Sequence, residues 1–456
     1  MKSLPNIIFI ITHDTGNYFG CYGYSVKTPN IDRLANEGVI FLNHFSCAPQ
    51  CTPSRGGILT GKLPHSNGLM GLTNMGWDLP DHNKTIPQLL KKAGYSTHLV
   101  GLQHTHHHPK KLGYDTISPR TDFPYMASTV VRRFKKFIKH VDQGEIKQPF
   151  FCSVGFFETH RHYGFTRDGS SPFNTSKTRF PAEPEEIQIP SYLPTDSSAV
   201  KNDISDFVSS VKEVDYYIGK IRKSIDNSLI KENTIIIFTV DHGIPLPRSK
   251  CTLYDPGISV PLIIHMPSEI KAKKVDDLVS NVDILPTLLD LVGLDFPEDL
   301  HGNSLTGLLI EDSNNKYNSR NHIYAELTFH DNGFNPIRCL RTKKWKYIRN
   351  LVPWGCLFEI PNDVFHSLSG KAFLEAHPEF YSPRATEELY DLELDPFEMN
   401  NLAKDQKYSA VKHDLSTHLM KFLKNTEDPA LHGEILEPEV PEEGPQKYIY
   451  DLETES

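Results

Sequence analysis

Residues 7–14, from Ile7 to Asp14, have the sequence IIFIITHD, a mostly β-branched apolar run that ends in polar residues. Such a run is typical of a strand that is buried on both faces of a parallel sheet. The run Thr234–Val240 has the same character and is followed by Asp241 and His242. Because ligands bind at the carboxyl ends of strands in open α/β sheets, we expect these polar residues to lie at one site.

A third apolar run, Phe150–Val154, leads toward another candidate site residue, His160. Between the runs, apolar residues from Ile204 to Ile225 recur every three or four positions, which predicts an amphipathic helix. Strands that alternate with helices predict an α/β fold with a mostly parallel sheet flanked by helices.

The pattern changes after about residue 310. Ile337–Arg349 alternates polar and apolar residues, as an antiparallel strand or hairpin does, and Leu415–Leu423 indicates a late helix. We therefore expect a large domain that carries the site over residues 1–315. A smaller C-terminal α+β domain with an antiparallel sheet should follow over residues 316–430, and an acidic, Pro-rich tail over 431–456.

Composition excludes several classes of protein. The chain has 456 residues and a formal net charge of −9, which argues against a nucleic-acid binder with a broad basic face. No run approaches the ~20 apolar residues of a membrane span. The apolar run at residues 7–11 is too short for a signal peptide core, so we expect a cytoplasmic protein, or a periplasmic or secreted one if the sequence was trimmed. Seven cysteines without a C-x-x-C spacing argue against a disulfide framework.

The segment Cys51–Arg55, CTPSR, resembles the C-x-P-x-R signature of the formylglycine-dependent sulfatases. In that family a maturation enzyme oxidises the cysteine to formylglycine, whose hydrated aldehyde carries two hydroxyls on one carbon. One hydroxyl attacks sulfur and the other later expels sulfate, which a plain serine or cysteine cannot do. A short pattern needs a matching context. Further segments are similar to sulfatases: Gly20–Gly23, Thr28–Ala35, Leu59–Gly61, Val240–Pro247, Leu253–Gly257, His301–Leu305 and Glu388–Pro396.

This resemblance implies an alkaline-phosphatase-like fold, and Val240–Pro247 with Leu253–Gly257 narrows it toward the sulfamidases, the heparan N-sulfatases. It also implies one divalent metal ion, held by Asp14, Asp241, His242 and the formylglycine made from Cys51. The family favours calcium. Here His13 stands where the family has a second aspartate, and since imidazole is a poor calcium ligand, manganese and zinc become alternatives.

The resemblance implies further roles, one residue at a time. Arg55 matches the arginine that stabilises the hydrated aldehyde, and His104 the general base for its second hydroxyl. His160 matches the histidine that contacts sulfate or protonates the leaving group, although Thr159 replaces the usual proline. Lys250 matches the basic residue that binds sulfate, although Arg248 lies close enough in the sequence to have that role instead.

One further position departs from the family. Leu102 stands where the family carries a sulfate-binding lysine. Gln103 or the run His106–His108 are candidates to replace that contact, although exposed histidine runs are often inert.

The resulting expectation is an enzyme that removes sulfate from a sulfated sugar, with N-sulfoglucosamine or a heparin-derived or heparan-derived fragment favoured. Its partners would be the saccharide and a formylglycine-generating maturation enzyme.

Three alternatives stay open: a phosphonate or phosphate ester hydrolase of the same superfamily, a non-catalytic protein that binds sulfated glycans, and a hydrolase with Cys51 as an ordinary thiol nucleophile. The loops Arg161–Pro194 and Phe329–Pro336 are candidate pocket walls. The leaving group and the oligomeric state stay open.

Overall fold

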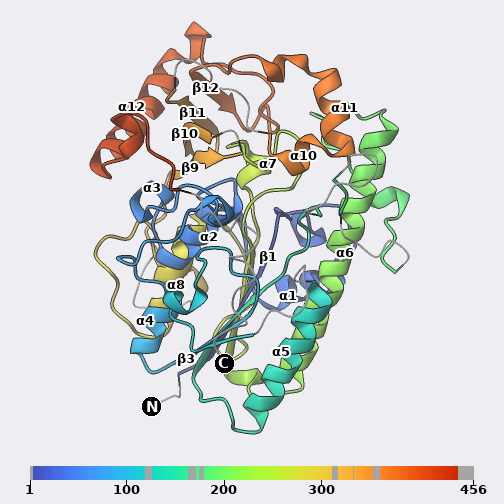
Figure 1. Ribbon diagram of the computed structural model, residues 1–456, viewed down its shortest axis with the longest axis vertical. Helices are drawn as coiled ribbons and strands as arrows, with labels where there is room; N and C mark the ends of the chain where they lie inside the picture. Colours follow the sequence, from blue (N-terminus) through green and yellow to red (C-terminus); the bar gives the residue numbers. More distant parts are fainter. Residues whose placement is uncertain are drawn as a thin grey trace.

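The computed structural model describes residues 4–118, 126–162, 171–173, 179–310, 317–331, 333–352 and 360–439. Within these ranges, eight strands form the central sheet, in the order β4-β3-β5-β1-β6-β7-β2-β8. Figure 1 shows this sheet in the middle of the molecule, where β1 and β3 are labelled. Their bounds are β1 Asn6–Thr12, β2 Val39–Phe45, β3 Ser96–Gly101, β4 Thr116–Ile117, β5 Phe150–Gly155, β6 Thr234–Val240, β7 Leu262–His265 and β8 Lys273–Ser280.

The sheet is parallel except at β7, which runs antiparallel to both β6 and β2. A parallel connection needs a crossover, usually a helix that packs on the sheet. The segment between β6 and β7 holds only the short helix α7 (Asp255–Ile258), so the chain returns in the opposite direction. The predicted mostly parallel sheet is confirmed.

Strand β1 lies at the centre of the sheet, between β5 and β6. Ile7 is paired in register with Phe151 on one side and with Ile235 on the other. Every residue of β1 is buried, as its continuous apolar sequence predicts.

Helices cover both faces of this sheet, and alternate residues of β1 serve the two faces. Ile8 and Ile10 pack in one apolar cluster, and Ile7, Phe9 and Ile11 in another. The first cluster lies against the helices right of β1 in Figure 1, which are α1 (Pro29–Glu37), α5 (Ala127–Asp142) and α6 (Ser198–Asp226). The second lies against α2 (Cys51–Thr60), α4 (Ile86–Lys92) and α8 (Ile284–Leu291).

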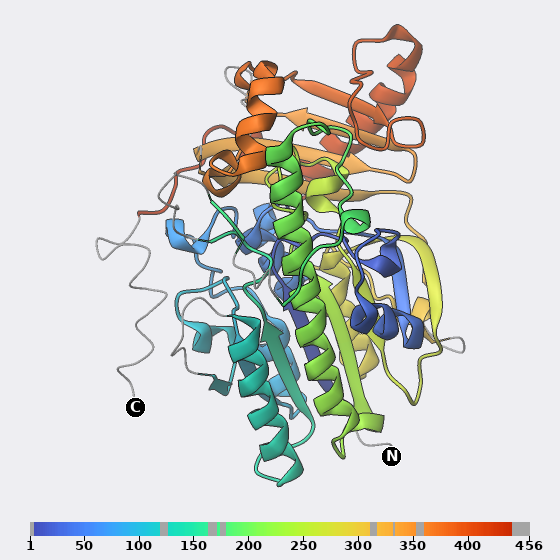
Figure 2. The same cartoon turned by 90° about the vertical axis from the view of Figure 1, so that its right-hand side faces the viewer.

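A second, antiparallel sheet follows in the order β12-β11-β10-β9. Its strands are β9 Ile323–His330, β10 Gly333–Arg341, β11 Trp345–Asn350 and β12 Glu387–Asp391, and it lies at the top of Figures 1 and 2. The predicted hairpin is β10 and β11, and the predicted late helix is α12 (Ser409–Asn425). The shorter helices are α3 Pro64–Asn67, α9 Thr306–Leu309, α10 Asn362–Phe365 and α11 Leu368–Ala376.

The two sheets are joined by packing. Phe45 of β2 and Leu278 of β8 belong to the same apolar cluster as Ile337 of β10. Phe373 of α11 likewise shares a cluster with Phe207 of α6. The expected boundary between residues 315 and 316 lies outside the described residues, as do residues 440–456 of the expected tail. Among the described residues, none of the helices combines the length and apolar character needed to cross a membrane.

Candidate active site

The ends of β1 and β6 meet, as their sequences predict. The backbone amide of Asp14 donates to Oδ1 of Asp241 at 3.0 Å, and the same oxygen accepts the amide of His242 at 2.9 Å. Asp14 adopts a left-handed backbone conformation with φ of 53°. An aspartate tolerates this region better than most residues.

Cys51 begins helix α2, next to these strand ends. Gln50 precedes it in an extended conformation, and Pro53 fits in the first turn because amides there have no intrahelical partner. Arg55 follows one turn later on the same side of the helix and donates from Nε to Oδ2 of Asp241 at 3.0 Å. The spacing between cysteine and arginine in the signature therefore directs both side chains toward the end of β6.

Five buried residues form a cluster that could hold a metal ion. His13, Asp14, Cys51, Asp241 and His242 each offer a donor atom, and these atoms lie within 4.8 Å of one another. Nε2 of His242 is 2.8 Å from Oδ1 of Asp14 and 3.4 Å from Sγ of Cys51. Nδ1 of His13 is 2.6 Å from Oδ1 of Asp14 and 3.3 Å from Oδ2 of Asp241.

The donor set fits a divalent cation. Burial by itself would raise the pKa of Asp14, but the charge of Lys250 and the neighbouring His242 hold it well below its usual range. Asp14 is therefore an ionised oxygen donor. Nδ1 of His13 faces the carboxylates of Asp14 and Asp241, and its Nε2 is buried without a hydrogen-bond partner among the described residues, so one nitrogen of this ring is not used by another described group. Carboxylates with imidazoles are ligands that manganese and zinc accept readily.

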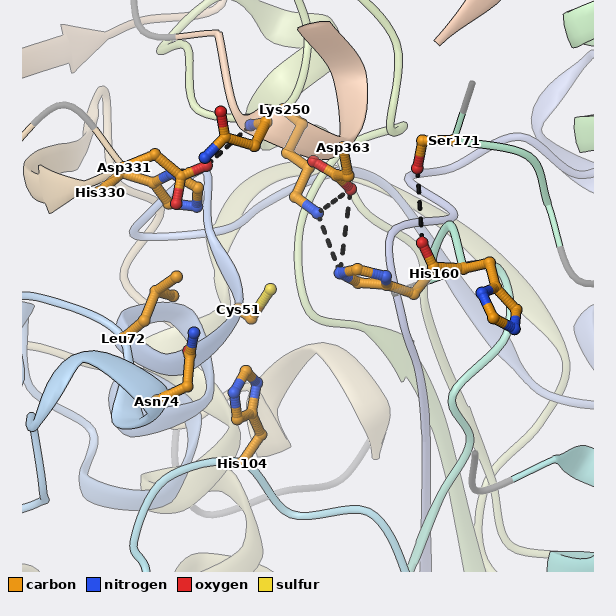
Figure 3. A pocket seen from close by; sticks show the side chains of 12 residues that line it. Cys51, Leu72, Asn74, His104, His160, Ser171, Lys250, His330, Asp331 and Asp363 are labelled. Carbon is orange, nitrogen blue, oxygen red and sulfur yellow. Dashed lines mark hydrogen bonds and ion pairs between the residues drawn. The ribbon is translucent and has the colours of Figure 1, made fainter. Parts of the chain in front are cut away.

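A pocket opens above this cluster, and four of the predicted catalytic residues line it: Cys51, His104, His160 and Lys250. Figure 3 shows the sulfur of Cys51 directed into this space, with His104 below it, Lys250 above it and His160 to its right. The remaining lining residues are Leu72, Asn74, His162, Ser171, His330, Asp331, Asn362 and Asp363.

Lys250, rather than Arg248, faces the pocket. Arg248 donates from Nη1 to the carbonyl of Phe397 at 2.6 Å, and its guanidinium lies 3.9 Å from the centre of the Tyr254 ring. Nζ of Lys250 lies 2.6 Å from Oδ2 of Asp14. Burial by itself would lower the pKa of Lys250, but the carboxylate of Asp14, with others nearby, raises it well above its ordinary value.

The proton on His160 is placed by its two neighbours. Nδ1 lies 2.6 Å from the carbonyl oxygen of Arg161, so it carries the hydrogen and donates. Nε2 lies 3.2 Å from Nζ of Lys250 and accepts. Burial, with the charge of Lys250, lowers the pKa of His160 to about 4, so the ring is neutral at pH 7.

His104 lies on the opposite side of Cys51 in the same pocket. Its backbone φ is 56°, and its Nδ1 is buried with no hydrogen-bond partner among the described residues. Burial lowers the pKa of His104 well below its ordinary value, so this ring is also neutral.

The residues expected to replace the missing lysine lie elsewhere. Leu102 lines a separate small cavity with Arg55. Gln103 donates from Nε2 to the carbonyl of His106 at 2.5 Å, and Nδ1 of His107 pairs with Asp78 at 2.9 Å. Among the described residues that line the pocket, therefore, Lys250 is the one with a permanently positive side chain.

The candidate pocket loops both contribute to the wall. His162 and Ser171 come from the first loop, of which residues 163–170 and 174–178 lie outside the described residues. His330 and Asp331 come from the second, where residue 332 lies outside them. Asp363 was missed, since no motif or periodic pattern surrounds it.

Comparisons with known proteins agree with this geometry. A family model described as Sulfatase matches residues 5–294, and one described as N-sulphoglucosamine sulphohydrolase, C-terminal, matches residues 248–360. An ulvan-active sulfatase of Formosa agariphila is 29% identical over 93% of this chain and 76% of its own length. The human N-sulphoglucosamine sulphohydrolase is 26% identical over 93% of this chain and 91% of its own length.

A solved structure has the same fold. It is described as a complex with its substrate, D-glucosamine-2-N,6-O-disulfate, and it superposes with a TM-score of 0.70 at 22% identity. The match covers 94% of this chain and 99% of that one.

Proposed function

Because the chain belongs to the sulfatase family, and is thus a hydrolase of sulfate esters or sulfamates with an alkaline-phosphatase-like fold, we propose that it desulfates N-sulfoglucosamine or a heparan-derived fragment. The match of residues 248–360 to the C-terminal model of N-sulphoglucosamine sulphohydrolases supports this choice among sulfated sugars. The human relative of that name supports it as well.

The observation that carries the proposal is the position of Cys51. It lies at the first turn of α2, its Sγ is 3.4 Å from His242, and it shares one pocket with Lys250 and His160. A nucleophile made from this residue would therefore stand between a metal-binding cluster and a cation suited to sulfate. The positive end of the helix dipole also favours an anion there.

We propose that the nucleophile is formylglycine and not the thiol. Burial raises the pKa of the Cys51 thiol well above its ordinary value, so the unmodified side chain would stay protonated. Since the thiolate is the reactive form, this disfavours the alternative of an ordinary cysteine nucleophile. In the hydrated aldehyde, one hydroxyl attacks sulfur, and the other expels sulfate as the aldehyde reforms.

The metal ligands in this proposal are His13, Asp14, Asp241, His242 and the modified residue 51. Calcium is favoured by the family, with manganese and zinc as alternatives because two of the donors are imidazoles. When bound, the ion would polarise a sulfate oxygen and lower the pKa of the attacking hydroxyl.

The pocket residues then have separate roles. Lys250 binds a sulfate oxygen, and its ammonium group supplies the proton that the departing nitrogen or oxygen takes up. His160, whose unprotonated Nε2 accepts from Lys250 at 3.2 Å, positions this ammonium group. His104, neutral and with a free Nδ1 among the described residues, accepts a proton from the second hydroxyl. Arg55 holds Asp241 in place beside residue 51.

Mass spectrometry and turnover test the proposal together. Protein made with a formylglycine-generating enzyme should carry formylglycine at residue 51 and release sulfate from N-sulfoglucosamine, and the Cys51→Ala variant should not. Full activity with an intact thiol would exclude the formylglycine mechanism.

The Asp241-His242 pair favours one second candidate, a phosphonate or phosphate ester hydrolase. Turnover of a phosphonate ester that far exceeds turnover of the sulfated sugar by the same preparation would favour that candidate. Binding of sulfated sugars without turnover of either substrate would favour the non-catalytic alternative.

A further inference from the structure

The ammonium group of Lys250 has three N–H donors and three acceptors around it. Nζ lies 2.6 Å from Oδ2 of Asp14, 3.2 Å from Nε2 of His160 and 2.9 Å from Oδ2 of Asp363. Its side chain is only 2% exposed. A sulfate oxygen can therefore bind this ammonium only if one of the three acceptors gives up its place.

Asp14 is not suited to give up its contact with Lys250. Its two oxygens face different partners: Oδ1 lies 2.8 Å from Nε2 of His242 in the proposed metal cluster, and Oδ2 faces Lys250. Because the two oxygens have separate partners, Oδ1 would be available to a metal ion while Oδ2 keeps its contact with Lys250.

His160 is also held in place. Its Nδ1 donates to the carbonyl of Arg161 at 2.6 Å, which directs Nε2 toward Lys250. Turning the ring away would break this second hydrogen bond inside a buried site, where an unpaired polar group is costly.

Asp363 is differently placed, because the hydrogen bond of its Oδ1 is local: it accepts the backbone amide of the next residue, Val364, at 3.0 Å. It belongs to the short helix α10, in the part of the chain that carries the second sheet, and its side chain lines the pocket and is 17% exposed. Figure 3 shows its carboxylate at the pocket wall beside Lys250 and His160. Like a sulfate group, the carboxylate of Asp363 offers Lys250 an anionic oxygen at hydrogen-bond distance.

We propose that Asp363 competes with the sulfate group for Lys250, so that each substrate displaces this carboxylate from the lysine and each departing sulfate is replaced by it. The inference rests on the proposed function. Its consequence is that Asp363 weakens the binding of sulfate, both as part of the substrate and as the product.

The test compares Asp363→Asn with the wild type, both loaded with metal, by titration with inorganic sulfate. Removing one negative charge at this distance should lower the dissociation constant for sulfate about tenfold. In turnover assays KM should fall, and inhibition by added sulfate should strengthen by a similar factor. Asparagine keeps the size of the side chain, and Asp363→Ser is the second variant if the unfolding midpoint of the first is much reduced.

Asp276→Asn is the control, because it also removes one negative charge, but from an exposed carboxylate that pairs with Lys343 at 2.6 Å and does not belong to the residues that line the pocket. Its sulfate affinity should change less than about threefold. Unchanged or weaker sulfate binding by Asp363→Asn, or an equal gain in the control, would overturn the inference, as would failure of sulfate to bind either protein. Sulfate release from the sugar by the wild type is a separate measurement, so a failed inference is distinguishable from a failed function.

Discussion

Arg161 and Asp203 form a buried, two-pronged ion pair beneath the pocket wall. Nη1 and Nη2 of the arginine donate to the two carboxylate oxygens at 2.8 Å and 2.6 Å, and neither side chain is more than 3% exposed. The arginine also donates to the carbonyls of Pro245, at 3.0 Å, and Ser171, at 2.9 Å. The pair thus joins helix α6 to the segments that follow His160 and His242.

We predict that Asp203→Ala destabilises the protein by about 3–5 kcal/mol, because it leaves a buried guanidinium without its counter-charge. The free energy of unfolding in urea measures this. The exposed pair Lys343 and Asp276, with an N–O distance of 2.6 Å, provides the control. Asp276→Ala should cost less than about 1 kcal/mol. Equal losses for the two variants would show that burial of the first pair is unimportant.

A second prediction separates Lys250 from Arg248, two neighbouring cations that the sequence leaves as competitors. Lys250→Met should lower kcat/KM about 10²–10³-fold, as loss of a donor to a developing anion does. Arg248→Met should leave kcat/KM largely unchanged and reduce stability, since its donors are used by the backbone carbonyls of Phe397 and Glu398. Lys250→Met should also lose stability, because buried Asp14 then lacks its counter-charge, so the loss of turnover is what separates the two variants. Steady-state kinetics and thermal unfolding of both variants distinguish these effects, and a larger loss of turnover in Arg248→Met would refute the assignment.

The site could be predicted from sequence where its residues follow buried strands. Asp14 and Asp241 come directly after continuous apolar runs, and parallel strands end at the same edge of a sheet. Choosing between Arg248 and Lys250 requires the direction of each side chain, and in such an irregular loop no periodicity supplies it. The antiparallel direction of β7 could not be predicted from the sequence, because a short apolar run has the same residue pattern in a parallel and in an antiparallel strand.

The position of Asp363 beside Lys250 could not be predicted from the sequence, for a different reason. It contacts a lysine 113 positions earlier in the chain, and its own segment has no motif. The same holds for Asp203, which reads as one polar position on an amphipathic helix although its carboxylate is buried. Long-range contacts between charged residues leave no periodic pattern.

A third prediction concerns acid stability. His44 is buried, its Nδ1 lies 3.2 Å from the carbonyl of Val260, and burial lowers its pKa to about 4. In the unfolded chain the pKa is about 6.5, so between pH 6.5 and 4 the unfolded state binds more protons and stability falls as the pH falls. This histidine should cost about 2–3 kcal/mol at pH 4.5 relative to pH 7.

Unfolding of the wild type and His44→Gln at both pH values measures that difference. The variant should show a correspondingly smaller loss of stability on acidification. The same loss in both proteins would mean that other groups account for the acid sensitivity.

The last prediction concerns the choice of metal. In the proposed ligand set His13 stands where the family has an aspartate, and its Nδ1 lies 2.6 Å from Oδ1 of Asp14, inside the cluster. Calcium prefers oxygen donors, whereas manganese and zinc accept imidazole. His13→Asp should therefore strengthen calcium binding and weaken zinc binding, each by about 10-fold or more. The shift of the unfolding midpoint with each metal, supported by direct titration, measures this without relying on activity.

His44→Gln, altered at a histidine outside the cluster, is the control and should leave both affinities unchanged. A parallel loss of both metals in His13→Asp would mean that residue 13 holds the site together without selecting the ion.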